Sequence, residues 1–164
     1  MVHPANSGVV RHSGPMGDVR ELRSAASARR QDAQAHTVEL VLTPERAAPR
    51  AARHWIMRSI ADAGVHGMSN QVIELLAGEV VANAVLHGPP DGEIRVEVRV
   101  EGEAVRVSVT DESPDRPRVL HPAPTAASGR GMALVAALST AWGIEHRSPS
   151  GKTVWFTVDP DAER

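Results

Sequence analysis

The clearest pattern along the chain is a strict alternation of apolar and polar side chains. In residues 94–100, Ile and Val occupy every second position, while Arg and Glu occupy the positions between them. A period of two places the apolar side chains on one face of an extended strand, so this pattern predicts strands with one buried face. The same alternation returns after the turn Glu101-Gly102-Glu103, which predicts a hairpin. The predicted strands are 36–42, 94–100, 105–110, 142–147 and 153–158.

Three segments between these strands carry helical signals. Thr43-Pro44-Glu45 predicts a helix start, because a hydroxyl can cap the helix, proline suits its first position and an acid favours its positive end. Gly64 then marks the stop of this helix. Ser69 is predicted to cap a second helix, which ends before Gly88, and Gly129-Arg130-Gly131 opens a third. The predicted helices are 43–63, 69–87 and 132–140.

The order of these elements determines the fold class that we expect. One strand, two helices, a hairpin, a third helix and a closing pair of strands follow one another along the chain. Strands joined by short turns pair antiparallel, and the helices between them cover the sheet. We therefore expect a two-layer α/β (α+β) sandwich with a mixed, mostly antiparallel sheet and helices on one face. The Pro-rich connection 113–128 is long enough to indicate a functional loop.

Residues 1–36 differ in composition from the rest of the chain. They hold five Arg, three acidic residues and very few large apolar side chains. Such a segment cannot bury enough surface to offset the entropy lost on ordering. We expect a disordered N-terminal extension here, with a short helix around 17–34 as the alternative. One folded domain at 37–159 and a short tail at 160–164 are expected to follow.

Composition excludes several classes of function. The 164 residues include no Cys, which excludes disulfides, zinc–thiolate sites and thiol catalysis. Aromatic residues make up 2% and the net charge is −2, so neither base stacking nor a basic field supports nucleic-acid binding. The apolar runs fall short of the roughly 18 residues of a membrane span, and a signal-peptide pattern is missing. We expect a cytoplasmic protein that binds neither nucleic acid nor membrane.

The second predicted helix carries the strongest candidate chemistry. Residues 72–86 are apolar almost all round, and Glu79, Asn83 and His87 follow at a spacing of four, which places them on one stripe. One interpretation is that this stripe faces solvent or satisfies neighbouring backbone groups. The other is a site, because an amide oxygen suits Mg²⁺ and a carboxylate one turn earlier could deprotonate a hydroxyl.

Two further candidates lie at predicted element ends. Asp111 follows the strand 105–110, where an aspartate can initiate a turn or accept a hydrogen bond from an amino group such as that of adenine. Gly129 and Gly131 precede a helix whose free N–H groups could meet a phosphate, although a simple loop closure would use the same glycines. The pattern fits neither the dinucleotide-binding fingerprint nor a Walker A loop, since Lys152 lies elsewhere in the chain.

Four motifs in this order and spacing resemble the GHKL ATPase superfamily, which includes the ATP domains of gyrase, heat-shock chaperones and histidine kinases. Within it, the chain is most similar to bacterial anti-sigma-factor serine/threonine kinases of the actinobacterial regulator type. The resemblance covers residues 37–158 and implies a Bergerat-type ATP-binding fold. The motifs are Glu79-Val-Val-Ala-Asn83-Ala-Val-Leu-His87-Gly88, Asp111-Glu-Ser-Pro114, Gly129-Arg-Gly-Met-Ala-Leu134 and Gly151-Lys-Thr-Val-Trp-Phe156.

The resemblance implies a role for each matching residue. Glu79 corresponds to the general base and Asn83 to the Mg²⁺ ligand, while Asp111 corresponds to the aspartate that reads adenine. The loop 113–128 corresponds to the lid over ATP, and His87 to a structural position. The residues expected to bind ATP are Asn83, Asp111, Ser113, Gly129, Arg130, Gly131, Met132 and Thr153, of which Thr153 would support the adenine contact.

The chain also departs from the superfamily's pattern. The usual Asp-x-Gly-x-Gly is replaced by Asp111-Glu-Ser-Pro-Asp115, and Ala133 stands where a further glycine could follow. No segment matches the phospho-accepting His region of a histidine kinase. ATP binding is still expected, with lid closure and affinity altered.

The resemblance therefore implies an ATP- and Mg²⁺-dependent anti-sigma kinase that regulates transcription. Its partners would be a sigma factor, held inactive, and an antagonist protein that carries the acceptor Ser or Thr. Arg53 is a candidate partner contact, and a homodimer through the sheet is expected from relatives. The alternatives are a nucleotide-gated binding module without kinase activity, and a scaffold that binds no nucleotide. Only the kinase needs the carboxylate of Glu79 for turnover.

Overall fold

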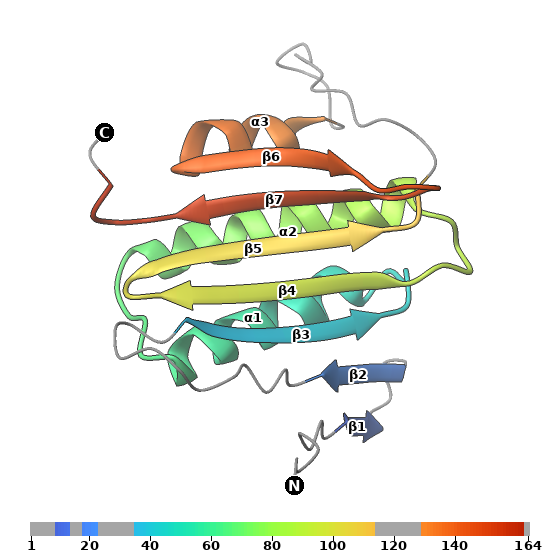
Figure 1. The fold of residues 1–164 in the computed structure, drawn as a ribbon, viewed down its shortest axis with the longest axis horizontal. Helices are drawn as coiled ribbons and strands as arrows, with labels where there is room; N and C mark the ends of the chain where they lie inside the picture. Colours follow the sequence, from blue (N-terminus) through green and yellow to red (C-terminus); the bar gives the residue numbers. More distant parts are fainter. Residues whose placement is uncertain (1–8, 14–17, 23–34, 114–128, 163–164) are drawn as a thin grey trace, which may run out of the picture.

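A seven-stranded antiparallel sheet forms the framework of the computed structural model, which describes residues 9–13, 18–22, 35–113 and 129–162. The strands follow the order β1-β2-β3-β4-β5-β7-β6, and each neighbouring pair is antiparallel (Figure 1). The strands are β1 (Val9–Ser13), β2 (Asp18–Leu22), β3 (His36–Leu42), β4 (Ile94–Glu101), β5 (Ala104–Asp111), β6 (Ala141–His146) and β7 (Lys152–Val158).

Three helices cover one face of this sheet (Figure 1). They are α1 (Ala48–Asp62), α2 (Ser69–His87) and α3 (Arg130–Leu138). α1 packs against β3 and β4, α2 against β4, β5 and β7, and α3 against α2 and β6. The predicted two-layer fold, with its helices on one face, is therefore confirmed.

The hydrophobic core lies between the two layers. Val107 on β5 pairs with Val98 on β4 and with Phe156 on β7, and all three side chains are fully buried. Ile56 of α1 and Leu76 of α2 belong to the same buried cluster on the side of the helix layer. Each such side chain contributes roughly 1.5–3 kcal/mol when it leaves water, so the alternating strands and the helices stabilise each other.

The first helix begins later than its sequence signal suggests. Thr43 does not cap it, because the Thr43 hydroxyl donates a hydrogen bond to Glu45 Oε1 at 3.1 Å and the helix starts at Ala48. Pro49, rather than Pro44, lies in the first helical turn. A proline further inside a helix would lose a hydrogen bond and clash with the preceding turn. Pro49 therefore determines where α1 can begin, and the predicted start at residue 43 is wrong.

The ends of the other helices agree with the prediction to within two residues. Ser69 is the first residue of α2 rather than its cap, since Met68 occupies the cap position without a capping side chain. The predicted end of α2 is confirmed, because the Gly88 N–H donates to the Ala84 carbonyl at 2.9 Å. α3 begins at Arg130 and ends at Leu138. In the described part of the chain, every helix is too short or too polar to cross a membrane.

Two strands lie within the segment that the composition predicts to be disordered. β1 and β2 form a short hairpin, and β2 pairs with β3 at Arg20–Val41, Glu21–Leu40 and Leu22–Glu39. The backbone of β3 would otherwise present an unpaired edge, which favours the addition of another strand. The structure differs from the disorder prediction at these two strands. The rest of 1–34, residues 114–128 of the predicted lid 113–128, and residues 163–164 lie outside the described part.

Candidate functional site

α2 carries two of the predicted site residues along its flank. Six apolar side chains of this helix are buried, and Glu79 and Asn83 lie beside them with part of their surface exposed. His87, at the last position of the helix, is exposed. Glu79 and Asn83 thus border the core and remain accessible to a ligand.

The start of α3 lies directly against Glu79. A Cβ atom built on Gly131 would be 2.5 Å from Glu79 Oε2 and 3.3 Å from Glu79 Cβ, so the absent side chain allows this approach. Gly129 precedes the helix in a left-handed conformation with φ of 87°. The first N–H groups of a helix have no partner within it and carry the positive end of its dipole. A carboxylate and an anion-attracting helix terminus therefore lie side by side.

Asp111 lies at the end of β5 and is 2% exposed. Its Oδ1 accepts a hydrogen bond from the Ser113 N–H at 2.7 Å. Its Oδ2 lies 2.9 Å from Lys152 Nζ, and Lys152 is 1% exposed. Burial of either charge alone would be strongly unfavourable, so the two groups depend on each other.

Three chain segments meet at Asp111. Gly88, just after α2, is a neighbour of Asp111, since a Cβ added to it would lie in van der Waals contact with Asp111 Cβ at 3.6 Å. Gly151, just before β7, has φ of +106°, and its Cβ would lie 2.7 Å from the Asp111 carbonyl oxygen. The Gly151 N–H also donates to the Ser113 carbonyl at 3.1 Å. The end of α2, the end of β5 and the start of β7 therefore form one corner around Asp111.

Thr153 points away from this corner. It pairs with Thr110, and the two hydroxyl oxygens are 2.8 Å apart. Successive side chains of a strand point to opposite faces, so Thr153 and Asp111's partner Lys152 lie on opposite sides of the sheet. Thr153 lines the hollow on the face without helices. The structure does not bring the Thr153 side chain together with Asp111.

The remaining predicted residues fall into three places. Ser113 is buried beside Asp111, whereas Arg130 is exposed as the first residue of α3. Met132, two residues later, is buried in the core. Arg53 is exposed on α1, and its Cδ would lie 2.9 Å from a Cβ built on Gly78 of α2. The Arg53 side chain therefore lies over Gly78, which directly precedes Glu79 in α2.

Lys152 is the residue of this corner that sequence patterns did not single out. Its signal is nevertheless present, because it is the only Lys among 18 basic residues and directly precedes a strand-like run. Counting by twos along 105–111 and 152–158 puts Asp111 and Lys152 at the ends of two apolar stripes. Only the pairing of β5 with β7 places the two ends opposite each other.

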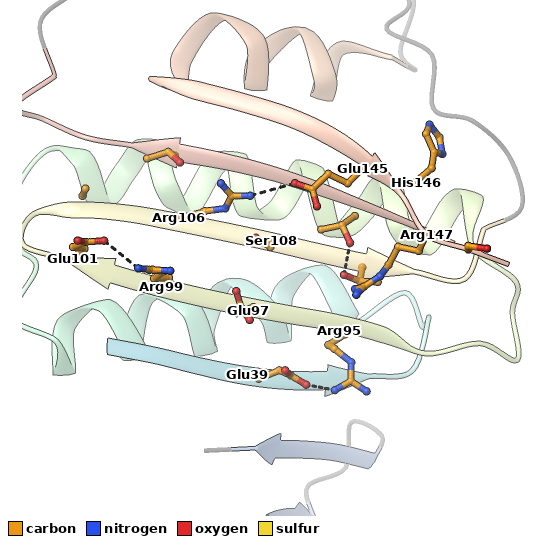
Figure 2. A pocket seen from close by; sticks show the side chains of 15 residues that line it. Glu39, Arg95, Glu97, Arg99, Glu101, Arg106, Ser108, Glu145, His146 and Arg147 are labelled. Carbon is orange, nitrogen blue, oxygen red and sulfur yellow. Dashed lines mark hydrogen bonds and ion pairs between the residues drawn. The ribbon is translucent and has the colours of Figure 1, made fainter. Parts of the chain in front are cut away.

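The sheet face opposite the helices, which we call the open face, is lined by charged side chains of both signs (Figure 2). Arg106 lies 3.6 Å from Glu145 and 3.9 Å above the centre of the Trp155 ring. Arg95 pairs with Glu39 across neighbouring strands. The hollow on this face lies on the other side of the sheet from Asp111 and Glu79. The open-face residues are Glu39, Arg95, Glu97, Arg99, Glu101, Arg106 and Glu145.

Comparison with known proteins identifies the class of this fold and site. The sequence matches the family of the histidine kinase-like ATPase domain over residues 40–158, and the chain therefore belongs to that family. Membership implies ATP binding and agrees with the resemblance to the GHKL superfamily. No protein of curated function matches the sequence.

Ten chains of solved structures match this chain. One of them is the crystal structure of the RsbU and RsbW domains of Rv1364c from Mycobacterium tuberculosis, with 26% sequence identity and a TM-score of 0.54. The match covers 73% of this chain and 32% of that chain, so our chain corresponds to about a third of its length.

The residues around Glu79 suit ATP and Mg²⁺. A Cβ on Gly131 would collide with Glu79 Oε2, so glycine is what allows Glu79 to lie against the α3 N-terminus. The N–H groups of such a helix terminus favour an anion such as a phosphate. Within the described ranges, no cluster of three His, Cys, Asp or Glu side chains could hold a metal ion by itself. Mg²⁺ often takes one or two protein oxygens and completes its shell with water and phosphate. The amide oxygen of Asn83, one turn after Glu79, fits such a ligand set.

Proposed function

We propose that this chain is an ATP-dependent serine/threonine protein kinase of the anti-sigma type. It would phosphorylate an antagonist protein and sequester a sigma factor. Family membership supports the ATP-dependent part, and the likeness to a structure with an RsbW domain supports the regulatory part. The observation that best supports kinase activity is the contact between Gly131 and the carboxylate of Glu79.

This contact combines the two elements that phosphoryl transfer to a hydroxyl requires. The N-terminus of α3 attracts a phosphate through free N–H groups and the helix dipole. Glu79 lies beside it and can accept the proton of a Ser or Thr hydroxyl as the hydroxyl oxygen attacks. Catalysis of this kind consists mainly of positioning and electrostatic stabilisation. ATP with Mg²⁺ supplies, when bound, the phosphoryl group and the cation that offsets the negative charges.

The other residues hold the nucleotide in this proposal. The backbone of Gly129, Arg130 and Gly131 holds the phosphates, and Asn83 holds Mg²⁺. Asp111 accepts a hydrogen bond from the amino group of adenine, and the Ser113 N–H keeps its carboxylate in place. Met132 anchors the first turn of α3 in the core. Thr153 faces the open side of the sheet, so we assign it an indirect role through β7.

The partners are assigned to two surfaces. The antagonist protein would approach Glu79 along α1 and α2, where the exposed Arg53 lies across Gly78. A second copy of the chain would pair through the open face. Arg side chains of one copy could then face Glu side chains of the other. These assignments place the acceptor hydroxyl and the dimer contact on opposite sides of the sheet.

The proposal is tested by binding and by phosphate transfer, measured on the same proteins. Calorimetric titration with Mg²⁺–ATP is applied to wild type, Asp111→Asn and Glu79→Gln. Transfer of labelled γ-phosphate is then measured with the proteins of a fractionated extract of the source cells as acceptors. Arg95→Met, which breaks an ion pair on the open face, is the matched control. We expect wild type and the control to bind ATP and to label a Ser or Thr.

The two site variants separate binding from catalysis. Asp111→Asn should lose ATP affinity, because an amide cannot replace a carboxylate that is held by two donors. Glu79→Gln should still bind ATP but lose labelling by a factor of about 100 or more, which is the contribution typical of a general base. ATP binding without any labelling by wild type would refute the kinase and indicate a nucleotide-gated binding module. The absence of binding heat up to millimolar ATP would indicate a scaffold.

A further inference from the structure

The buried ion pair between Asp111 and Lys152 stands at the end of an otherwise apolar ladder. Toward the helix layer, β5 and β7 pair Val105 with Val158, Val107 with Phe156 and Val109 with Val154. The next pair on this face is Asp111 with Lys152, at 2% and 1% exposure. Continuation of the apolar ladder would stabilise the fold as well as a buried ion pair does, and often better. The charges therefore require an explanation beyond stability.

The contacts of the ion pair leave Asp111 able to accept further hydrogen bonds. A carboxylate offers about four acceptor positions, two on each oxygen. The Ser113 N–H occupies one position on Oδ1, and Lys152 Nζ occupies one on Oδ2. Each oxygen keeps a further lone pair for another donor. Because each oxygen has its own donor, rotation of the carboxylate would break both contacts, and its orientation is fixed.

The contact with Lys152 also determines what Asp111 can accept. Lys152 Nζ lies 2.9 Å from Oδ2, and the Ser113 N–H donates to Oδ1 at 2.7 Å. A carboxylate held between two donors in this way presents its remaining lone pairs to a third donor, such as an amino group. Such a group favours a 6-amino purine over a 6-oxo purine.

We propose that Lys152 is the positioning residue that makes Asp111 selective for the amino group of the nucleotide base. This role rests on the proposed function, in which Asp111 meets adenine. Lys152 acts through Asp111: its contact with Oδ2 holds the carboxylate in one orientation as an acceptor, and the selectivity between ATP and inosine triphosphate depends on it. The two nucleotides differ at the 6 position of the base, so their affinity ratio reports on this contact.

The test measures the dissociation constants of Mg²⁺–ATP and of inosine triphosphate with Mg²⁺ for wild type, Lys152→Met and Lys152→Arg. Wild type should favour ATP by about tenfold or more, the size expected for a hydrogen bond to a charged group. Lys152→Met should lose most of this preference, and Lys152→Arg should keep it because the charge remains. Partial unfolding lowers both apparent affinities by the same factor, so the ratio is insensitive to a loss of stability.

Two further variants show whether Lys152 acts through Asp111. The double variant Asp111→Asn/Lys152→Met, which replaces the ion pair with neutral groups, should have the same ratio as Asp111→Asn alone. Glu103→Gln, in the exposed turn between β4 and β5, should keep the wild-type ratio. An unchanged ratio in Lys152→Met, with both affinities lowered or raised equally, would overturn the proposal. Wild type that binds neither nucleotide would instead refute the proposed function, and this role with it.

Discussion

At the scale of single residues, the site depends on positions where a side chain is missing. Gly131 allows α3 to reach Glu79, and Gly151 allows β7 to reach the backbone of Asp111. Gly151 also has a positive φ, which most other residues adopt only with strain. Glycines in exposed turns are different. At Gly102, for example, an added Cβ would have no neighbouring atom within 4 Å. The difference can be measured.

We expect Gly151→Ala to lower the free energy of unfolding by about 2–4 kcal/mol, from the left-handed backbone together with an overpacked contact. The contact is with the carbonyl oxygen of Asp111, which cannot rotate away. Gly102→Ala is the matched control, because it shares the positive φ and should lose only about 1 kcal/mol. Urea titration of both variants gives the comparison, and equal losses would contradict the close approach.

Gly131→Ala should affect ligand binding more than stability. The new methyl group would meet the end of the Glu79 side chain, which can rotate toward solvent, so unfolding should change by less than about 1 kcal/mol. The methyl group itself would stand in the first turn of α3, where a phosphate would approach the N–H groups, and should lower ATP affinity by about tenfold or more. Calorimetry checks the affinity, with Ala137→Gly on the exposed side of α3 as control. Unchanged ATP affinity would remove Gly131 from the phosphate site.

At the scale of elements, the helices are positioned by proline and glycine as well as by their apolar faces. Pro49 determines the start of α1, and Gly78 in the middle of α2 provides the surface on which Arg53 of α1 lies. A glycine inside a helix is unfavourable by roughly 1 kcal/mol relative to alanine. The contact with Arg53 is the structural reason for a glycine at this position.

A double-mutant cycle measures this contact between α1 and α2. In wild type, Gly78→Ala gains helix propensity but pushes against Arg53 Cδ, so we expect a net change near zero. In the Arg53→Ala background, the same substitution should stabilise the protein by about 0.5–1 kcal/mol. The difference between the two backgrounds, obtained from urea titrations, is the coupling energy. Equal effects in both backgrounds would show that Arg53 does not lie across Gly78 in solution.

At the scale of the whole molecule, the sheet separates two surfaces that carry different side chains. The helix side holds Glu79, Asn83 and Asp111, and the open face holds charged pairs such as Arg106–Glu145 (Figure 2). Asp111 joins α2, β5 and β7, so a nucleotide bound there would connect the helix layer to the sheet. Ligand binding should therefore stabilise the fold as a unit.

Saturating Mg²⁺–ATP should raise the free energy of unfolding of the wild-type protein. A ligand present at 100 times its dissociation constant contributes about 2.7 kcal/mol if it binds only the folded state. Asp111→Asn should abolish this gain, whereas Arg95→Met, on the open face, should retain it. Thermal unfolding with and without nucleotide gives the measurement. Equal gains in Asp111→Asn and wild type would place the nucleotide elsewhere.

The fold was largely predictable from local sequence. Alternating apolar positions identify each strand from β3 to β7, because the period of two depends only on which face is buried. The apolar run of α2 and the glycine after it locate the central helix and its end for the same reason. The start of α1 is the exception. Thr43 and Pro44 have the residue types of a helix start, but the helix begins at Ala48 with Pro49 in its first turn.

The sequence by itself determined the strands β3 to β7, the two-layer architecture and the helix that carries Glu79 and Asn83, whereas β1, β2 and the start of α1 escaped it. Tertiary structure alone decided which side chains meet: Lys152 with Asp111, Gly131 with Glu79, and Thr153 with Thr110 on the far face. A local pattern specifies which residues of one strand share a face. It does not specify the register between strands that are distant in sequence, because that register depends on how the intervening chain closes.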